Sequence, residues 1–202
     1  MRRVLWILLL CACSKPAAKI DDDAKTAAVR QSVVKVGPIG TGAPEEASYA
    51  LVDVENASAV DRLVTVGGKL GPATLGADEL RVPAHAVRTF ALVADKPVPD
   101  GAEPTFEVTH AVAVDYPAPV TVSDLQDKKG DLFVATAKVK NTVERAASVV
   151  VACTYYDAAG KILARPFTVL ELAGSAEQPV RFEGPREAEK AVIFVGQVAY
   201  KP

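Results

Sequence analysis

Residues 131–165 read DLFVATAKVKNTVERAASVVVACTYYDAAGKILAR, and this stretch decides the predicted fold. From Phe133 to Val139 every second residue is apolar, while Lys138 and Lys140 belong to the other set. A period of two suits a β-strand, whose successive side chains point to opposite faces, and excludes a helix. The polar pair Asn141-Thr142 then interrupts the pattern, as expected where a strand ends in a turn.

A second strand is predicted from Ala147 to Tyr156, where β-branched and aromatic residues dominate. Asp157-Ala158-Ala159-Gly160 follows and matches a type I turn with a bulge, with Gly at the left-handed position. Lys161 to Val169 is predicted to return as the third strand. Three antiparallel strands in so short a segment predict a β-meander, because no residues remain for a crossover helix.

The same region resembles the FxLYD family of small immunoglobulin-like domains from prokaryotic envelope and extracellular proteins, over roughly residues 119–200. The motifs that carry the resemblance are Lys140-Asn141, Tyr156-Asp157, Gly160-Lys161 and Leu172-Ala173-Gly174. Cys153 stands where the family has Phe, and Tyr155 stands at its Leu. The resemblance implies an immunoglobulin-like fold and an envelope address, and it implies no catalytic residues.

The start of the chain is typical of an exported lipoprotein. Arg2 and Arg3 precede a short apolar run, Val4 to Leu10, which is too short to span a bilayer. Leu10-Cys11-Ala12-Cys13 resembles a lipobox, so residues 1–12 are predicted to be a signal peptide. The alternative is an ordinary secretory signal with two incidental cysteines.

On the lipoprotein interpretation the mature chain begins at an acylated Cys13, and membrane lipid is its first partner. Several acyl chains would hold the protein stably on a membrane. The sorting rule for bacterial lipoproteins concerns Asp after the acylated Cys; Ser14 stands here, which favours the outer membrane over the inner. Residues 13–31 have no apolar period and are predicted to be a tether. Cys153 is then left without a disulfide partner within the chain, and a small buried apolar role is expected for it. The alternatives are a reactive thiol and a disulfide that joins two copies.

The body is predicted to be all-β, with two tandem immunoglobulin-like β-sandwich domains at residues 32–116 and 119–202. Strand-like runs bounded by Gly and Pro recur along both segments. Three pairs of residues suggest an internal duplication, with offsets of 85, 87 and 92: Asn56 and Asn141, Val33 and Val120, and Phe90 and Phe182. Residues 116–119, Tyr-Pro-Ala-Pro, are predicted to join the domains stiffly, because alternate prolines fix the backbone.

Charge excludes one class of partner. Removal of the signal peptide deletes two arginines and leaves 21 basic and 25 acidic side chains. No basic patch or basic helix remains in the sequence, so nucleic acid is not an expected partner.

No catalytic or cofactor motif is found. His85 and His110 are the only histidines, and neither has metal-ligand spacing around it, so no metal or cofactor is expected. The glycines of residues 37–42 lack the Lys-Ser/Thr ending of a phosphate loop and are interpreted as a turn. Tyr155 and Tyr156 should point to opposite faces of their strand. Tyr156 is therefore a candidate interaction residue, as is Tyr116 between the domains, since aromatic side chains are enriched at interfaces. The alternative is a Tyr that covers a sheet edge.

The sequence thus predicts a lipid-anchored, non-catalytic envelope protein that binds an unidentified envelope protein. Sheet edges are the expected contact, because their unpaired backbone groups invite a partner strand. Two segments are candidate edge guards: Arg81-Val82-Pro83 and Arg165-Pro166. The alternatives are a small-ligand carrier with an apolar cavity in or between the sandwiches, and a hydrolase that uses His85 or His110.

Overall fold

The computed structural model describes residues 26–37 and 47–201, so the predicted signal peptide, Cys13 and most of the tether lie outside the described residues. The described chain is built from β-strands, which confirms the all-β prediction. The strands of the first half are β1 (Ala27–Val36), β2 (Ser48–Asn56), β3 (Arg62–Leu70), β4 (Ala73–Val82), β5 (Val87–Val93) and β6 (Pro104–Ala113). The strands of the second half are β7 (Val120–Lys129), β8 (Phe133–Asn141), β9 (Ala147–Tyr156), β10 (Ile162–Ala164), β11 (Phe167–Leu172), β12 (Glu177–Gly184) and β13 (Lys190–Tyr200). Within this described part, no helix is long and apolar enough to span a bilayer.

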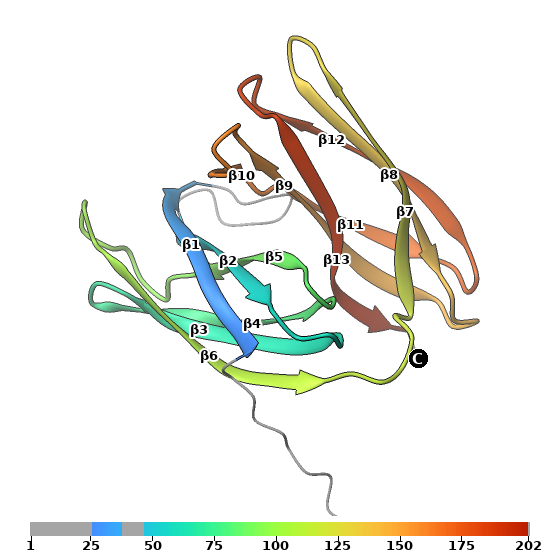
Figure 1. Ribbon diagram of the computed structural model, residues 1–202, viewed down its shortest axis with the longest axis horizontal. Coiled ribbons are helices and arrows are strands. Elements are labelled where there is room, and N and C mark those ends of the chain that lie inside the picture. The colour runs from blue at the N-terminus through green and yellow to red at the C-terminus, as the bar shows by residue number, and fades with distance from the viewer. Residues whose placement is uncertain (1–25, 38–46, 202) are drawn as a thin grey trace, which may run out of the picture.

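Each half consists of two antiparallel sheets with the same order of strands (Figure 1). In the first half, sheet A has the order β1-β2-β5 and sheet B the order β4-β3-β6. In the second half, sheet C has the order β7-β8-β12, and in sheet D the central β9 pairs with β10 and β11 on one side and with β13 on the other. The strands of the two halves therefore correspond: β7 to β1, β8 to β2, β9 to β3, β12 to β5 and β13 to β6. The place of β4 is taken by β10 together with β11.

The predicted β-meander is wrong. β8 pairs with β7 and β12, whereas β9 pairs with β10, β11 and β13, so the chain leaves sheet C and enters sheet D between them. Only β9 and β10 form the expected hairpin. Asp157 Oδ1 accepts hydrogen bonds from the amides of Ala159 (2.9 Å) and Lys161 (2.8 Å), and Gly160 has a φ of 78°. This turn confirms the interpretation of residues 157–160.

Asn141 is the residue that carries the chain from one sheet to the other. Its side chain is fully buried, and Nδ2 donates to the carbonyls of Arg145 at 2.8 Å and Ala173 at 3.1 Å. Its Oδ1 accepts from the amide of Val143 at 3.1 Å. Because this buried side-chain amide is fully hydrogen-bonded, it fixes the position where the chain passes from one sheet to the other. The alternation of apolar and polar residues along a strand does not show such a change of sheet.

Asn56 forms the same corner in the first half. Its Nδ2 donates to the carbonyls of Val60 at 2.8 Å and Val82 at 3.0 Å, and its Oδ1 accepts from the amide of Ser58 at 3.0 Å. Both asparagines thus donate to the carbonyl of the residue four positions later, and both accept from the amide of the residue two positions later. The offset of 85 residues therefore joins two structurally equivalent positions.

The turn that closes each corner is also repeated. His85 and Ser175 both have a positive φ, 53° and 57°. The amide of His85 donates to Ser58 O at 3.3 Å, and the amide of Ser175 donates to Val143 O at 2.9 Å. These turns lie 90 residues apart, so the second repeat is longer between its corner and its turn. The other two predicted pairs are wrong in register, because Thr26 corresponds to Pro119 and Phe90 to Val180.

Each half has its own apolar core between its sheets. In the second half, Val149, Val151, Cys153 and Tyr155 all face this core and are fully buried. The buried role expected for Cys153 is thereby confirmed. In the first half, Val64, Val66 and Leu70 of β3 take equivalent places in the core.

Two predicted boundaries differ from the structure. β1 begins at Ala27 rather than at residue 32, so residues 27–31 of the predicted tether are strand. Most of these residues are exposed at a sheet edge, which is why no apolar period marks them. The predicted strand 161–169 is divided into β10 and β11 by Arg165-Pro166, because Pro166 cannot donate a ladder hydrogen bond.

Candidate functional site

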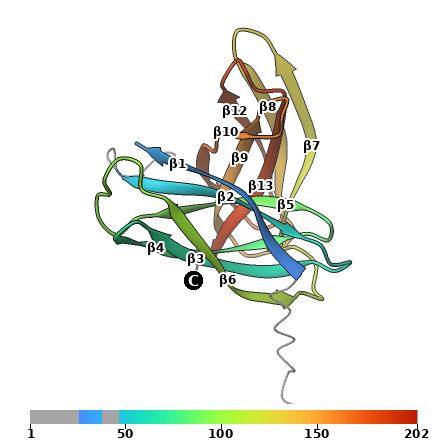
Figure 2. The same ribbon diagram turned by 60° about the vertical axis from the view of Figure 1, so that its left-hand side comes forward.

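The two halves meet face to face. The outer face of sheet D packs on part of the outer face of sheet A, so that β2 and the end of β9 are buried on both faces. Figures 1 and 2 show the two halves against each other. Tyr49 and Leu51 of β2 pack against Tyr156 and Ile162 of the second half. Sheet D also contacts β4 of sheet B through β13, so the second half covers both the outer face of sheet A and the side of the first sandwich formed by β4 and β5.

Phe194 of β13 extends this contact to the first half's own core. Its side chain and that of Ala152 belong to the same buried cluster as the side chains between sheets A and B. The guanidinium groups of Arg88 and Arg165 lie over the Phe194 ring, with Cζ 5.4 and 5.3 Å from its centroid. One arginine comes from each half, so this aromatic ring holds both together.

A polar cluster is buried in the middle of the interface. Thr89 Oγ1 lies 2.6 Å from Asp53 Oδ1 and donates to it, and the Tyr156 hydroxyl lies 2.9 Å from Thr89 Oγ1 and 3.2 Å from Asp53 Oδ1. The exposed fractions of these residues are 3% for Asp53, 0% for Thr89 and 7% for Tyr156. Burial raises the pKa of the Tyr156 hydroxyl, and the nearby Asp53 carboxyl raises it further. The hydroxyl thus remains a proton donor toward the first half.

Arg165 is the second buried polar contact between the halves. Its Nε donates to the backbone carbonyl of Thr89 at 2.6 Å, and only 8% of the residue is exposed. Burial lowers the pKa of Arg165 to about 10, while the charge of Asp78 opposes this shift. The guanidinium is therefore charged at neutral pH. Arg165-Pro166 does not guard a sheet edge, because Arg165 enters the interface.

Gln31 forms hydrogen bonds to both halves at the exposed edge of the interface. Its amide nitrogen donates to Asp53 Oδ2 at 3.0 Å and to the carbonyl of Gly160 in the β9–β10 turn at 2.6 Å. One side chain thereby connects β1, β2 and the second half. Gln31 lies in β1 rather than in the predicted tether, and no sequence pattern marks its role in the interface.

The candidate interaction residues lie in very different places. Tyr155 and Tyr156 point to opposite faces as predicted, but the face of Tyr156 is covered by the first half. Tyr116 is 56% exposed, and its ring lies under the Arg81 guanidinium at 5.5 Å from Cζ to the ring centroid. Arg81 also bonds Asp61 at 2.8 Å and the Tyr116 carbonyl at 2.8 Å, so it fixes the joint between the halves rather than guarding an edge.

The two histidines are exposed. His85 occupies the left-handed turn, and His110 lies on β6 opposite Thr65 of β3. Among residues 26–37 and 47–201, neither imidazole makes a hydrogen bond or an ion pair, and no group of three or more His, Cys, Asp or Glu could hold a metal ion.

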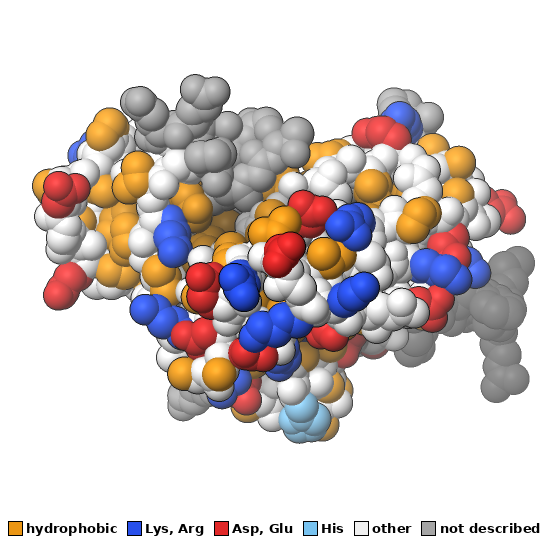
Figure 3. All heavy atoms as spheres, turned by 90° about the horizontal axis from the view of Figure 1, so that it is seen from above, with side chains coloured by type: hydrophobic (Ala, Val, Ile, Leu, Met, Phe, Trp, Pro, Cys, Tyr) orange, Lys and Arg blue, Asp and Glu red, His pale blue; other side chains and the backbone are white. Residues whose placement is uncertain are grey.

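A shallow hollow of about 340 Å³ lies beside the β7–β8 hairpin on the outer face of sheet C. Its lining is Lys128, Gly130, Asp131, Leu132, Val134, Arg181 and Glu183. Arg181 and Glu183 pair with each other at 2.7 Å, so the hollow presents both signs of charge around Val134 and Leu132. Basic and acidic side chains are likewise interspersed over the molecular face seen in Figure 3.

The outer edge of β12 is closed to strand pairing. The amide of Asn141 donates to Ala176 O, so these two residues form a hydrogen-bonded pair. Hydrogen-bonded and non-hydrogen-bonded pairs alternate along an antiparallel ladder, and Pro179 with Lys138 is therefore a non-hydrogen-bonded pair. The backbone nitrogen of Pro179 thus points away from β8. A proline there leaves the free edge without a donor, a usual protection against edge pairing. Gln178 also donates to the carbonyl of Glu171 in β11 at 3.3 Å. Pro179 is thus the edge guard that the sequence interpretation missed.

No protein-family model matches the chain, and comparison with curated proteins gives no relative.

Proposed function

We propose that this chain is a lipid-anchored, non-catalytic envelope protein whose two β-sandwiches form one rigid body that binds a protein partner. The interface between sheets A and D carries the proposal. Four polar residues are buried there and are hydrogen-bonded within and between the halves: Asp53, Thr89, Tyr156 and Arg165. Separating the halves would break the bonds between them and would therefore cost free energy. Such an interface is suited to holding a binding surface in a fixed pose.

The anchor rests on the sequence around Cys13, and Ser14 favours the outer membrane. Membrane lipid is then held by the acyl chains of Cys13. An immunoglobulin-like relationship to the FxLYD family is consistent with the antiparallel sandwich of residues 120–200, and it remains part of the proposal. Nucleic acid and cofactors have no part in it.

The β7–β8 hairpin is our candidate for the surface that meets the protein partner. Figures 1 and 2 show that it projects from the end of the molecule opposite to the start of β1. Leu125 and Leu132 are 49% and 47% exposed on this hairpin, and the adjoining hollow offers charges of both signs. Exposed apolar side chains with a polar rim are typical of protein interfaces.

Two alternatives receive less support. A small-ligand carrier requires an apolar cavity inside one sandwich or between the two. Buried apolar side chains pack inside each sandwich, and Leu51, Tyr156 and Ile162 pack against each other between them. A hydrolase requires an imidazole beside a carboxylate or hydroxyl, which neither His85 nor His110 has within the described residues.

Site-specific photocrosslinking in native membranes tests the proposal. A photoreactive amino acid at Leu132 should give a discrete protein adduct, whereas the same group at Lys69, on sheet B, is the matched exposed control. The double variant His85→Ala, His110→Ala should keep the adduct and the cellular phenotype. Loss of the phenotype with normal folding and membrane level would support the hydrolase instead, and equal labelling from both positions would contradict the hairpin as a binding surface.

A further inference from the structure

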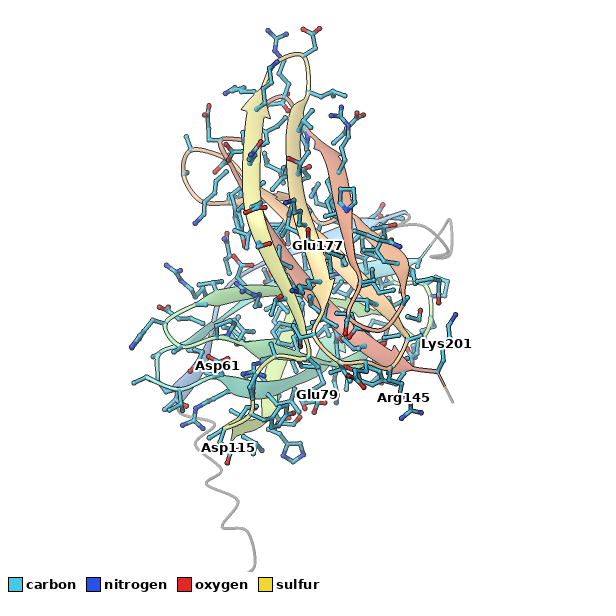
Figure 4. All side chains as sticks on the ribbon, turned by 90° about the vertical axis from the view of Figure 1, so that its right-hand side faces the viewer. Asp61, Glu79, Asp115, Arg145, Glu177 and Lys201 are labelled. Atoms are coloured by element: carbon cyan, nitrogen blue, oxygen red, sulfur yellow. The ribbon has the colours of Figure 1, made fainter. Side chains whose placement is uncertain are left out.

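The corner at which the chain enters the first sandwich has an unusual surface. We call residues 57–60 together with Tyr116 the entry corner. The amide of Ala57 donates to the carbonyl of Thr26 at 2.8 Å, which places this corner beside the start of β1. Asp61 follows the corner directly and accepts the amide of Val114 on its carbonyl at 2.9 Å, which brings Tyr116 to the same end. Figure 4 shows Asp61 and Asp115 at this end of the first half.

The entry corner exposes apolar side chains. Val60 is 46% and Tyr116 56% exposed, and the small residues Ala57 and Ala59 are exposed between them. Asp61 is neutralised by Arg81 at 2.8 Å, which leaves Asp115 as the exposed charge next to Tyr116. A tyrosine with small apolar neighbours suits a boundary between hydrocarbon and water, where its ring and its hydroxyl are both accommodated.

The duplicated corner of the second half provides an internal comparison. It is the segment 142–145, whose corner residue Asn141 makes the same bonds as Asn56. Glu144 and Arg145 occupy the positions of Ala59 and Val60 there, and Arg145 donates to the carbonyl of Lys201 at 2.6 Å. Figure 4 shows Arg145 and Lys201 together at this charged corner. Val143 is also exposed at the second corner, at 37%, but charged Glu144 and Arg145 flank it there, whereas Ala59 and Val60 stand at the entry corner.

We infer that the entry corner rests on the lipid surface of the membrane that holds the anchor. This inference depends on the proposed acylation of Cys13. Residues 14–25 separate Cys13 from Thr26, and twelve residues reach roughly 40 Å at full extension. The entry corner adjoins Thr26, the described residue that is nearest to Cys13 along the chain, and the β7–β8 hairpin lies at the opposite end of the molecule.

Depth-dependent quenching on vesicles tests the inference. An environment-sensitive fluorophore is attached to Ala59→Cys, to its duplicate Glu144→Cys, or to the hairpin variant Leu132→Cys. Buried Cys153 does not compete for the label. The full acylated protein is reconstituted in vesicles of phosphatidylethanolamine and phosphatidylglycerol. The fluorophore at 59 should show a blue-shifted emission and be quenched by nitroxide lipids, whereas those at 144 and 132 should show neither effect. Val60→Arg, which copies Arg145, should abolish the blue shift at 59.

The same measurement on residues 14–202, held by an N-terminal hexahistidine on nickel-chelating lipid, separates this inference from the proposed anchor. If the native chain does not float with vesicles but residue 59 is quenched on the nickel lipid, the anchor proposal fails and the lipid-facing corner stands. If the chain floats and position 59 is not quenched more than 144 and 132 in either format, the inference is overturned.

Discussion

The Tyr156 hydroxyl oxygen of the second half lies 3.2 Å from Asp53 Oδ1 of the first, and both groups are buried. Tyr156 Oη, Thr89 Oγ1 and Asp53 Oδ1 form a triangle that contains two hydroxyl protons. Asp53 and Thr89 are paired within sheet A, and Tyr156 reaches them because sheet D packs on sheet A. Their contact makes the relative position of the halves sensitive to a single hydroxyl group.

Tyr156→Phe should therefore destabilise the protein. The change keeps the ring beside Leu51 and Ile162 and removes a donor from a buried carboxyl group, at a cost of about 1–3 kcal/mol. Urea unfolding of the purified body measures this loss. Tyr116→Phe is the matched control, because the Tyr116 side chain is 56% exposed, and it should change stability by less than about 0.5 kcal/mol. Equal effects from the two variants would show that the buried hydroxyl contributes nothing.

Arg165→Ala should be more damaging than Arg181→Ala. Arg165 loses its bond to Thr89 O and its place over Phe194, and a cost of about 2–4 kcal/mol is expected for a buried charged partner. Arg181 pairs with Glu183 on the surface, where such a pair contributes at most about 1 kcal/mol. Thermal or urea unfolding of both variants measures the difference. A smaller loss for Arg165→Ala than for Arg181→Ala would exclude an important role of Arg165 in the interface.

Gly184→Ala should strain the core of the second half. A Cβ at position 184 would lie 2.4 Å from the Tyr155 ring, which is held edge-on by Phe133. Overpacking of this kind costs about 1–3 kcal/mol. At Gly67 a Cβ would meet nothing within 4 Å, so Gly67→Ala should be neutral or slightly stabilising. Comparison of the two urea midpoints tests the prediction, which a midpoint for Gly184→Ala at or above that of the wild type would contradict.

Stability should fall at alkaline pH. Burial raises the pKa of the Cys153 thiol from 9.0 to about 12 and also raises the pKa values of Tyr155 and Tyr156. The folded state keeps these protons, whereas the unfolded chain releases the thiol proton first. The thiol's stabilising contribution is therefore complete below pH 9.0 and is lost as the pH rises toward about 12.

Urea midpoints measured from about pH 8 to about pH 11 should show this decline. Cys153→Ala should reduce the slope in the lower part of that range, because the tyrosines titrate only at higher pH. A midpoint that is constant throughout, or an identical slope in the variant, would contradict the assignment to Cys153.

The periodicity of single strands could be predicted from the sequence, but their assignment to sheets could not. Alternation along Phe133–Val139 and Ala147–Tyr156 identifies the core face of each strand. Whether β8 and β9 pair depends on the buried Asn141 side chain and its bond to Ala173, which is distant in sequence. The sequence pairs Asn56 correctly with Asn141, but the other two predicted repeat pairs are wrong in register because the loops of the repeats differ in length.

The interface between sheets A and D could not be predicted from the periodicity of single strands, although a comparison of the two repeats contains a signal for it. Once the repeats are aligned, Leu51, Asp53 and Ala91 of sheet A correspond to Thr136, Lys138 and Arg181 of sheet C. The outward residues of the buried sheet A are thus apolar or, like Asp53, hydrogen-bonded, whereas those of the exposed sheet C are polar or charged. Only an alignment by register shows this difference, because in a single strand an outward Leu is not distinguishable from a core residue. The charged outer face of sheet C agrees with the rule that terminal units of a repeat need a polar outer surface.

A distance measurement between the halves tests the central claim, that both sandwiches form one rigid body. Spin labels are attached at Lys69→Cys in β3 and Lys140→Cys in β8, two exposed positions on different halves, in residues 14–202. Pulsed electron–electron double resonance should give a single narrow distance distribution that matches the structure. A broad distribution, or one with several separate peaks, would show that the halves move independently and would contradict the account.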